Sequence, residues 1–164
     1  MPLSPASSPI EKARVQALRL LKFRSRSEAE LRIRLGHSGF SSSVVEELLT
    51  EFKEKKLLDD AKFAQLFATY RLEAKPMGRR GLLESLRLKG VSGNQATQAV
   101  EQAFEEKTEL EMAREAASTR VSHMKGLSPQ VVQRRLFGFL GRRGFSTDVI
   151  YRVVREISSR SAAG

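Results

Sequence analysis

The residues best suited to binding chemistry are arginines that recur at similar places along the chain. Arg80 and Arg87 lie seven residues apart, and so do Arg135 and Arg142. Seven helical steps return to within about 20° of the starting direction, so each pair shares one face of a helix. A guanidinium can form a bidentate contact with a phosphate or a carboxylate. The two pairs therefore predict surfaces that bind anions.

Other basic side chains extend these surfaces, and a further group lies near the N-terminus. The complete candidate surface is Arg24, Arg26, Arg32, Arg34, Arg79, Arg80, Arg87, Lys89, Arg134, Arg135, Arg142 and Arg143. The net charge of +10 indicates a polyanionic partner or an acidic face of another protein. Acidic residues concentrate elsewhere, at 46–60 and 101–115, so we expect an oriented surface. The alternative is an ordinary solvated helix face with scattered cations.

Patterns for catalysis or metal binding are sparse. The S-x-x-K spacing at 122–125 has no companion motif. His37 and His123 have no metal-ligand partners at a useful spacing, and the Gly-rich run at 76–81 lacks the G-K-[ST] ending of a phosphate loop. The absence of cysteine excludes disulfides and thiol chemistry. We therefore predict a protein that is not an enzyme and holds no cofactor and no metal.

The elements that carry the arginines repeat along the chain. Gly39-Phe40-Ser41, Gly90-Val91-Ser92 and Gly144-Phe145-Ser146 follow one another at intervals of roughly 50 residues. Leucines stand eight and four residues before each glycine: Leu31 and Leu35, Leu82 and Leu86, and Leu136 and Leu140. A period of this length is typical of stacked units, each too small to bury a core alone.

Each unit is expected to contain three helices. We predict an all-α fold in which three tandem three-helix modules, at 10–57, 58–104 and 105–160, form an elongated curved array after a disordered N-terminal tail at 1–9. The repeated glycine ends the second helix of each module, because a helix C-terminus favours a left-handed residue there. No alternating strand pattern is present.

Capping signals predict where several helices begin. Ser27 with Glu30 has the spacing of a capping box, and Asp59-Asp60 favours a helix N-terminus. Ser43 with Glu46 and Ser92 with Gln95 are weaker candidates for caps, and Ser128-Pro129 is a strong start signal. The first helix of the third module is expected over 105–125. In the second module we expect an apolar stripe formed by Phe63, Leu66, Phe67 and Tyr70.

Targeting signals are missing from the sequence. No apolar run approaches the roughly 20 residues that a membrane span needs. Residues 1–9 have neither the basic head nor the apolar stretch of a signal peptide. We therefore expect a cytoplasmic monomer that does not contact a membrane.

A helix-turn-helix DNA reader is a second interpretation of the layout. The second helix, the glycine turn and the third helix of each module have roughly that arrangement. The third helices at 42–55 and 92–104 are acidic or neutral, however, and only 146–160 has a charge that suits a recognition helix. Sequence-specific readout of DNA is therefore the less favoured interpretation.

Three stretches of the chain carry a distinctive set of residues in order. The first runs from Ala17-x-x-Leu20-Leu21 through Ser27-x-x-Glu30-Leu31. The second is Leu57-Leu58-Asp59-Asp60-x-x-Phe63-Ala64, then Arg71, then Gly78-x-x-x-Leu82-x-x-x-Leu86-x-x-Lys89-Gly90-Val91. The third is Leu140-x-Arg142-Arg143-Gly144-Phe145-Ser146-x-x-Val149-Ile150. Together they resemble the RecX family of bacterial regulatory proteins over residues 10–160. Ser85 departs from the family, which often has Glu there.

The resemblance implies both a fold and a function. It implies three tandem three-helix modules in an elongated, curved molecule. It also implies a regulator of the RecA recombinase, usually an inhibitor of its ATPase and strand exchange, which binds along the groove of the RecA–single-stranded DNA filament. The partners implied are therefore the RecA filament and, with it, single- or double-stranded DNA. The repeat, the basic surface and the lack of a catalytic pattern agree with this hypothesis.

Two other classes of function remain open. The chain could be a non-specific nucleic-acid-binding or architectural protein that acts without RecA, using phosphate neutralisation alone. The absence of Trp and the presence of only two Tyr argue against stacking on the bases of single strands. A scaffold that binds only an acidic protein partner is a third, weaker hypothesis.

Overall fold

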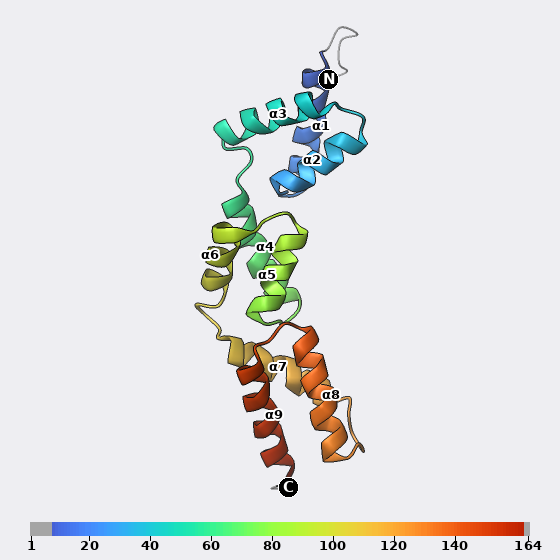
Figure 1. Cartoon of the computed structure of the whole chain (residues 1–164), viewed down its shortest axis with the longest axis vertical. Coiled ribbons are helices and arrows are strands. Elements are labelled where there is room, and N and C mark those ends of the chain that lie inside the picture. The colour runs from blue at the N-terminus through green and yellow to red at the C-terminus, as the bar shows by residue number, and fades with distance from the viewer. Residues whose placement is uncertain (1–7, 163–164) are drawn as a thin grey trace.

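Three groups of three helices follow one another along the long axis of the molecule (Figure 1). The structure, a computed structural model, describes residues 8–162, and within that range the chain contains nine α-helices and no strand. Module one comprises α1 (Pro9–Phe23), α2 (Glu28–His37) and α3 (Ser42–Glu54). Module two comprises α4 (Asp60–Ala74), α5 (Arg79–Leu88) and α6 (Gly93–Ala103), and module three α7 (Glu109–Val121), α8 (Pro129–Arg142) and α9 (Thr147–Ala162). The predicted all-α tandem repeat is confirmed.

Side-chain caps explain the starting positions of several helices. The Ser27 hydroxyl accepts from the Glu30 amide at 3.1 Å, and the Glu30 carboxylate accepts from the Ser27 amide at 3.2 Å. Asp59 caps α4 by accepting from the Lys62 amide at 3.0 Å. A cap of this kind contributes about 1 kcal/mol to helix stability. Both predicted helix starts are confirmed.

Two of the weaker capping predictions are wrong. Helix α3 begins after Ser41, whose hydroxyl accepts from the Val44 amide, so Ser43 lies inside the helix. Glu46 points instead to Arg32 of α2, which donates to it at 2.6 Å. At the start of α6, Ser92 occupies the N-cap position as predicted, but its side chain makes no capping hydrogen bond. At α3 a neighbouring serine therefore supplies the cap, and Glu46 pairs with another helix.

The ends of the chain and the start of module three also differ from expectation. Helix α7 begins at Glu109 rather than 105, because Thr108 and Glu111 form a capping box that the prediction missed. Of the tail predicted at 1–9, residues 1–7 lie outside the described residues. Ser8 caps α1, and Pro9 occupies its first turn.

The hydrophobic core forms two clusters. One lies within module one and includes Leu58, and the other extends through modules two and three. The repeated leucines Leu31, Leu35, Leu82, Leu86, Leu136 and Leu140 are all fully buried. The stripe expected on α4 is only half right, because Leu66 and Tyr70 are 56% and 70% exposed. Small residues, Ala64 and Ala68, are buried instead, which allows α4 and α6 to pack closely.

The repeated glycine turn also joins neighbouring modules. The turn after α5, at Gly90, lies directly against Ala29 near the start of α2. The Ser27 hydroxyl donates to the Lys89 carbonyl across the same junction. Gly39 has the same left-handed backbone, with φ of 89°, but a Cβ added there would meet nothing. The glycine motif therefore ends a helix in all three modules, and in the second it also contacts the preceding module.

The junction between modules two and three repeats this arrangement more tightly. The turn after α8, at Gly144, lies against Gly78 and Gly81 at the start of α5. The Gly78 amide donates to the Arg143 carbonyl at 2.9 Å. A Cβ added at any of the three glycines would overlap backbone atoms of the other module. Backbone therefore packs on backbone here, which holds the two modules in one relative orientation.

Candidate functional site

Contacts inside the molecule divide the twelve candidate cations into two classes. Eight of them contact other groups of this chain: Arg24, Arg26, Arg32, Arg79, Arg80, Arg87, Lys89 and Arg143. For the other four no ion pair or hydrogen bond of the side chain is found among residues 8–162: Arg34, Arg134, Arg135 and Arg142. Cations without an internal partner are the ones most available to an external anion.

In module one, three of the four predicted cations are held within the fold, and the exposed Arg34 is the exception. Arg24 pairs with Glu30 at 2.8 Å, and Arg32 contacts both Glu28 and Glu46, at 2.7 and 2.6 Å. These hydrogen bonds raise the pKa of both arginines. Arg26 is only 7% exposed and donates to the Leu20 carbonyl at 3.3 Å, so its prediction as a surface residue is wrong.

Glu30 is the most strongly perturbed carboxylate at the junction of modules one and two. Burial alone would raise its pKa, but hydrogen bonds from Arg24 and the Ser27 amide, with the nearby charge of Lys89, outweigh burial and lower the pKa to about 2. Because this value lies below the ordinary value of 4.5, ionised Glu30 stabilises the fold above about pH 4.5. That stabilisation is lost as the pH falls toward 2.

Glu30→Gln should therefore reduce the free energy of unfolding at pH 7 by about 1–2 kcal/mol, after allowance for solvent screening and for the weakened cap. The difference from the unmodified protein should shrink as the pH falls from 5 toward 2.5. Urea unfolding followed by circular dichroism at several pH values measures this difference. A gap that stays constant with pH would show that the charge of Glu30 does not contribute.

In module two the arginine face lies where the sequence predicted. Arg80 and Arg87 are exposed, and Leu82 and Leu86 of α5 are buried on another face. Arg87 forms an exposed pair with Glu84 at 2.7 Å, and Arg80 donates to the Gly141 carbonyl at 3.4 Å. An exposed pair of this kind contributes little to stability, so Arg87 can exchange its partner at low cost.

Two further candidates of module two rest on aromatic rings. The Arg79 guanidinium lies 4.8 Å from the centre of the Phe104 ring. The Lys89 ammonium lies 5.8 Å from the Phe67 ring and 3.3 Å from Glu30 of module one. Both side chains therefore contribute to packing as well as to surface charge.

In module three the outer face of α8 carries unpaired arginines. Arg134, Arg135 and Arg142 are exposed, while Leu136 and Leu140 are buried on the inner face. Arg143 differs from them, because it is half-buried and donates to the Pro76 carbonyl at 2.8 Å. The α8 face is therefore the largest group of free cations among the predicted site residues.

The structure also gathers basic residues that the sequence did not single out. A pocket of about 300 Å³ lies between the end of α4, α7 and α8, and Lys75, Arg120, His123 and Arg143 line it. Of these, only Arg143 belonged to the predicted surface. The others come from segments far apart in the sequence, so periodicity on one helix could not reveal them.

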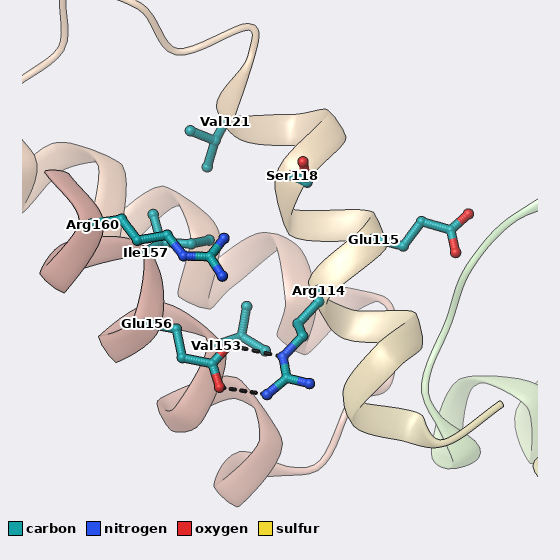
Figure 2. Close-up of a pocket in the computed structure, with 8 residues that line it drawn as sticks. All are labelled: Arg114, Glu115, Ser118, Val121, Val153, Glu156, Ile157 and Arg160. Carbon is teal, nitrogen blue, oxygen red and sulfur yellow. Dashed lines mark hydrogen bonds and ion pairs between the residues drawn. The ribbon is translucent and has the colours of Figure 1, made fainter.

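A larger pocket, of about 510 Å³, is lined by residues of α7 and α9 (Figure 2). Val121, Val153 and Ile157 form its apolar wall, and Arg114 donates to Glu156 at 2.7 and 2.8 Å across it. No histidine lines this pocket. Among residues 8–162, no three His, Cys, Asp or Glu side chains are grouped so that they could hold a metal ion. No helix of the described part is long and apolar enough to cross a membrane.

Comparison with known proteins identifies the repeat. Models of the first, second and third three-helix domains of RecX match residues 13–52, 59–100 and 107–154. The chain belongs to the RecX family. The three RecX domains match modules one, two and three in order, so the family predicted from the sequence motifs is confirmed.

Individual RecX relatives match almost the whole chain. Regulatory protein RecX of Amycolatopsis mediterranei (strain U-32) is 35% identical, over 94% of this chain and 90% of the relative. That of Streptomyces coelicolor is also 35% identical, over 93% of this chain and 80% of the relative. These relatives support a regulator of the RecX type.

Solved RecX structures share the fold. The crystal structure of RecX from Lactobacillus salivarius matches with a TM-score of 0.79 at 21% identity, covering 90% of this chain and 96% of that one. A second crystal structure, of a regulatory protein RecX, matches with a TM-score of 0.82 at 21% identity, covering 90% of this chain and 73% of that one.

Proposed function

We propose that this chain regulates the RecA recombinase by binding the RecA–single-stranded DNA filament and reducing its ATPase and strand-exchange activities. Membership of the RecX family through all three domains is the observation that carries this proposal. The protein acts by binding, as a cytoplasmic monomer without catalysis of its own, in recombination and DNA repair.

The arrangement of the modules supports binding along a filament. Three modules in a row present a long surface, and the backbone contacts at Gly78, Gly81 and Gly144 hold two of them in a set orientation (Figure 1). Weak contacts made by several linked modules add up, because the first contact raises the effective concentration of the next. The exposed arginines of α8 would face acidic protein surface or DNA phosphate.

The ATPase activity of RecA tests this proposal. RecA is assayed on excess single-stranded DNA at physiological salt while this protein is titrated in. We expect inhibition at less than one copy per RecA protomer, because a bound regulator blocks or weakens contacts beyond a single protomer. Excess DNA prevents simple competition for DNA from producing this result. Undiminished ATPase at a ratio of one to one would contradict the proposal.

A non-specific DNA-binding function without RecA is the second candidate. The unpaired Arg134, Arg135 and Arg142 favour it, since cations on an open helix face can neutralise phosphates. Such binding should weaken by about 10³–10⁵ between 50 and 200 mM salt if six to ten phosphates are contacted. Salt-sensitive DNA binding together with a null result in the ATPase assay would favour this candidate.

A further inference from the structure

The pocket between modules two and three gathers positive charge without a carboxylate. It has a volume of about 300 Å³, and its basic lining residues are Lys75 after α4, Arg120 and His123 from α7 and its end, and Arg143 after α8. Ala74, Pro76, Ala116, Thr119 and Phe139 complete the lining, so no acidic side chain is among the lining residues in the described part of the chain. Elsewhere in the molecule, as at Arg32, clustered charges are balanced by glutamates.

Aromatic and backbone contacts hold two guanidiniums at this pocket. Arg143 and Arg120 lie 4.7 and 5.4 Å from the centre of the same Phe139 ring. Arg143 also donates to the Pro76 carbonyl at 2.8 Å, which leaves other N–H groups of its fork for a further acceptor. The His123 Nδ1 donates to the Thr119 carbonyl at 2.8 Å, which fixes its ring. Such contacts reduce the entropy that the side chains lose when a ligand binds.

The arginines at this pocket repel one another. Burial, with the like charges of Arg71 and Arg120, lowers the pKa of Arg143. Arg71 on α4 therefore adds to the positive potential at Arg143. An anion in the pocket would remove this repulsion and accept the free N–H donors.

One lining residue of the pocket, Phe139, lies on the arginine face of α8. Phe139 follows Arg135 by four residues and precedes Arg142 by three, so the three share one side of the helix. The pocket thus borders the side of α8 that carries two exposed arginines without a partner among the described residues. Several cationic positions in a row suit a ligand with evenly spaced negative charges better than a single small anion.

We propose that this pocket binds a backbone phosphate of a nucleic acid strand, with Arg135 and Arg142 contacting neighbouring phosphates. The guanidinium forks suit the non-bridging phosphate oxygens, and the Phe139 ring offers an apolar surface to the adjoining sugar. This inference deepens the proposed function by naming the DNA-contacting site. Its test uses free DNA and no recombinase, so the two proposals can fail separately.

The test compares two variants with the same change in charge. Lys75→Gln/Arg120→Gln alters the pocket, and Lys12→Gln/Arg19→Gln alters two exposed residues of α1 that have no partner in the described part of the chain. Binding of a fluorescein-labelled single-stranded oligonucleotide is followed by anisotropy over a range of salt concentrations. We expect the pocket variant to bind the oligonucleotide about tenfold more weakly. The slope of log binding constant against log salt concentration should become shallower by about 1.

The α1 control variant should retain its slope and most of its affinity. Circular dichroism melts of both variants show whether the fold is intact, and Lys75→Arg provides a further pocket variant that keeps the charge and should keep the affinity. An equal loss of DNA affinity in the two double variants, or an unchanged DNA affinity in the pocket variant, would overturn the proposal.

Two further arms distinguish other ligands. Calorimetry with inorganic phosphate and with a mononucleotide shows whether free phosphate compounds are the better ligand. In that case the unmodified protein would bind the small compound tightly, the pocket variant would not, and the affinity for DNA would be the same in both. Normal DNA binding combined with weaker RecA inhibition by the pocket variant would assign the pocket to an acidic protein segment. Either result would contradict a site for DNA phosphate.

Discussion

Gly81→Ala is expected to destabilise the protein by about 2–4 kcal/mol, although alanine is the better helix former by about 1 kcal/mol. Gly81 lies in the first turn of α5, and a Cβ added there would overlap the Arg143 carbonyl oxygen of module three. That oxygen belongs to a turn that also donates and accepts backbone hydrogen bonds, so it cannot move aside as a flexible side chain could. The substitution must therefore separate α5 from the turn after α8.

Whether Gly81→Ala lowers or raises the free energy of unfolding tests the contact between modules two and three. Gly36→Ala is the matched control, because Gly36 is also helical and a Cβ there would meet nothing within 4 Å. We expect the control to be as stable as the unmodified protein or more stable by up to about 1 kcal/mol. Urea unfolding of both variants measures the difference. If Gly81→Ala were also neutral, modules two and three would not be held together by this backbone contact.

Charge reversal on α8 is expected to have the second large effect. Arg135→Glu/Arg142→Glu should weaken the inhibition of RecA ATPase by about 100-fold, because each change replaces an attraction to an anionic partner by a repulsion. Neither side chain has a partner among the described residues, so the helical content and the melting temperature should change little. A glutamate at the last residue of α8 costs only about 0.5 kcal/mol against the helix dipole.

A control with the same charge change separates this surface from net charge. Lys12→Glu/Arg19→Glu reverses two exposed cations on α1, in the module farthest from α8 (Figure 1). We expect this variant to retain most of its inhibition. Inhibition that survives in the α8 variant, or falls equally in both, would remove the α8 arginines from the mechanism. Extending the α8 variant with Arg80→Glu and Arg87→Glu would then test the α5 face.

Residue type and spacing alone did not distinguish the arginines that are free from those that are paired within the fold. Arg32 and Arg135 are both helical arginines one residue away from a repeated buried leucine. Arg32 is nevertheless held by Glu28 and Glu46, one of which comes from a different helix, whereas Arg135 has no partner in the described part of the chain. Periodicity predicts the side of a helix that a residue occupies, but not what the neighbouring helix places opposite it.

The basic pocket shows the same limit for the candidate site. Five basic residues contribute to the pocket, from helix ends and turns of modules two and three: Arg71, Lys75, Arg120, His123 and Arg143. The residues of module two form no local motif with those of module three. They meet only because the Gly78–Gly144 junction brings α4, α7 and α8 together. A useful signal was nevertheless present, since Arg71 and Arg143 both lie within the stretches that resemble the RecX family.

Local chemistry was enough to specify the helices of this protein and the family to which it belongs. Helix periodicity, the Ser27 cap and the left-handed glycine turns act over a few residues, so they can be recognised without knowledge of the fold. The use of each cation depends on contacts between segments distant in the sequence. Whether Arg26 is buried, Arg32 paired or Arg135 free follows from helix packing, because burial and partners are properties of the assembled modules.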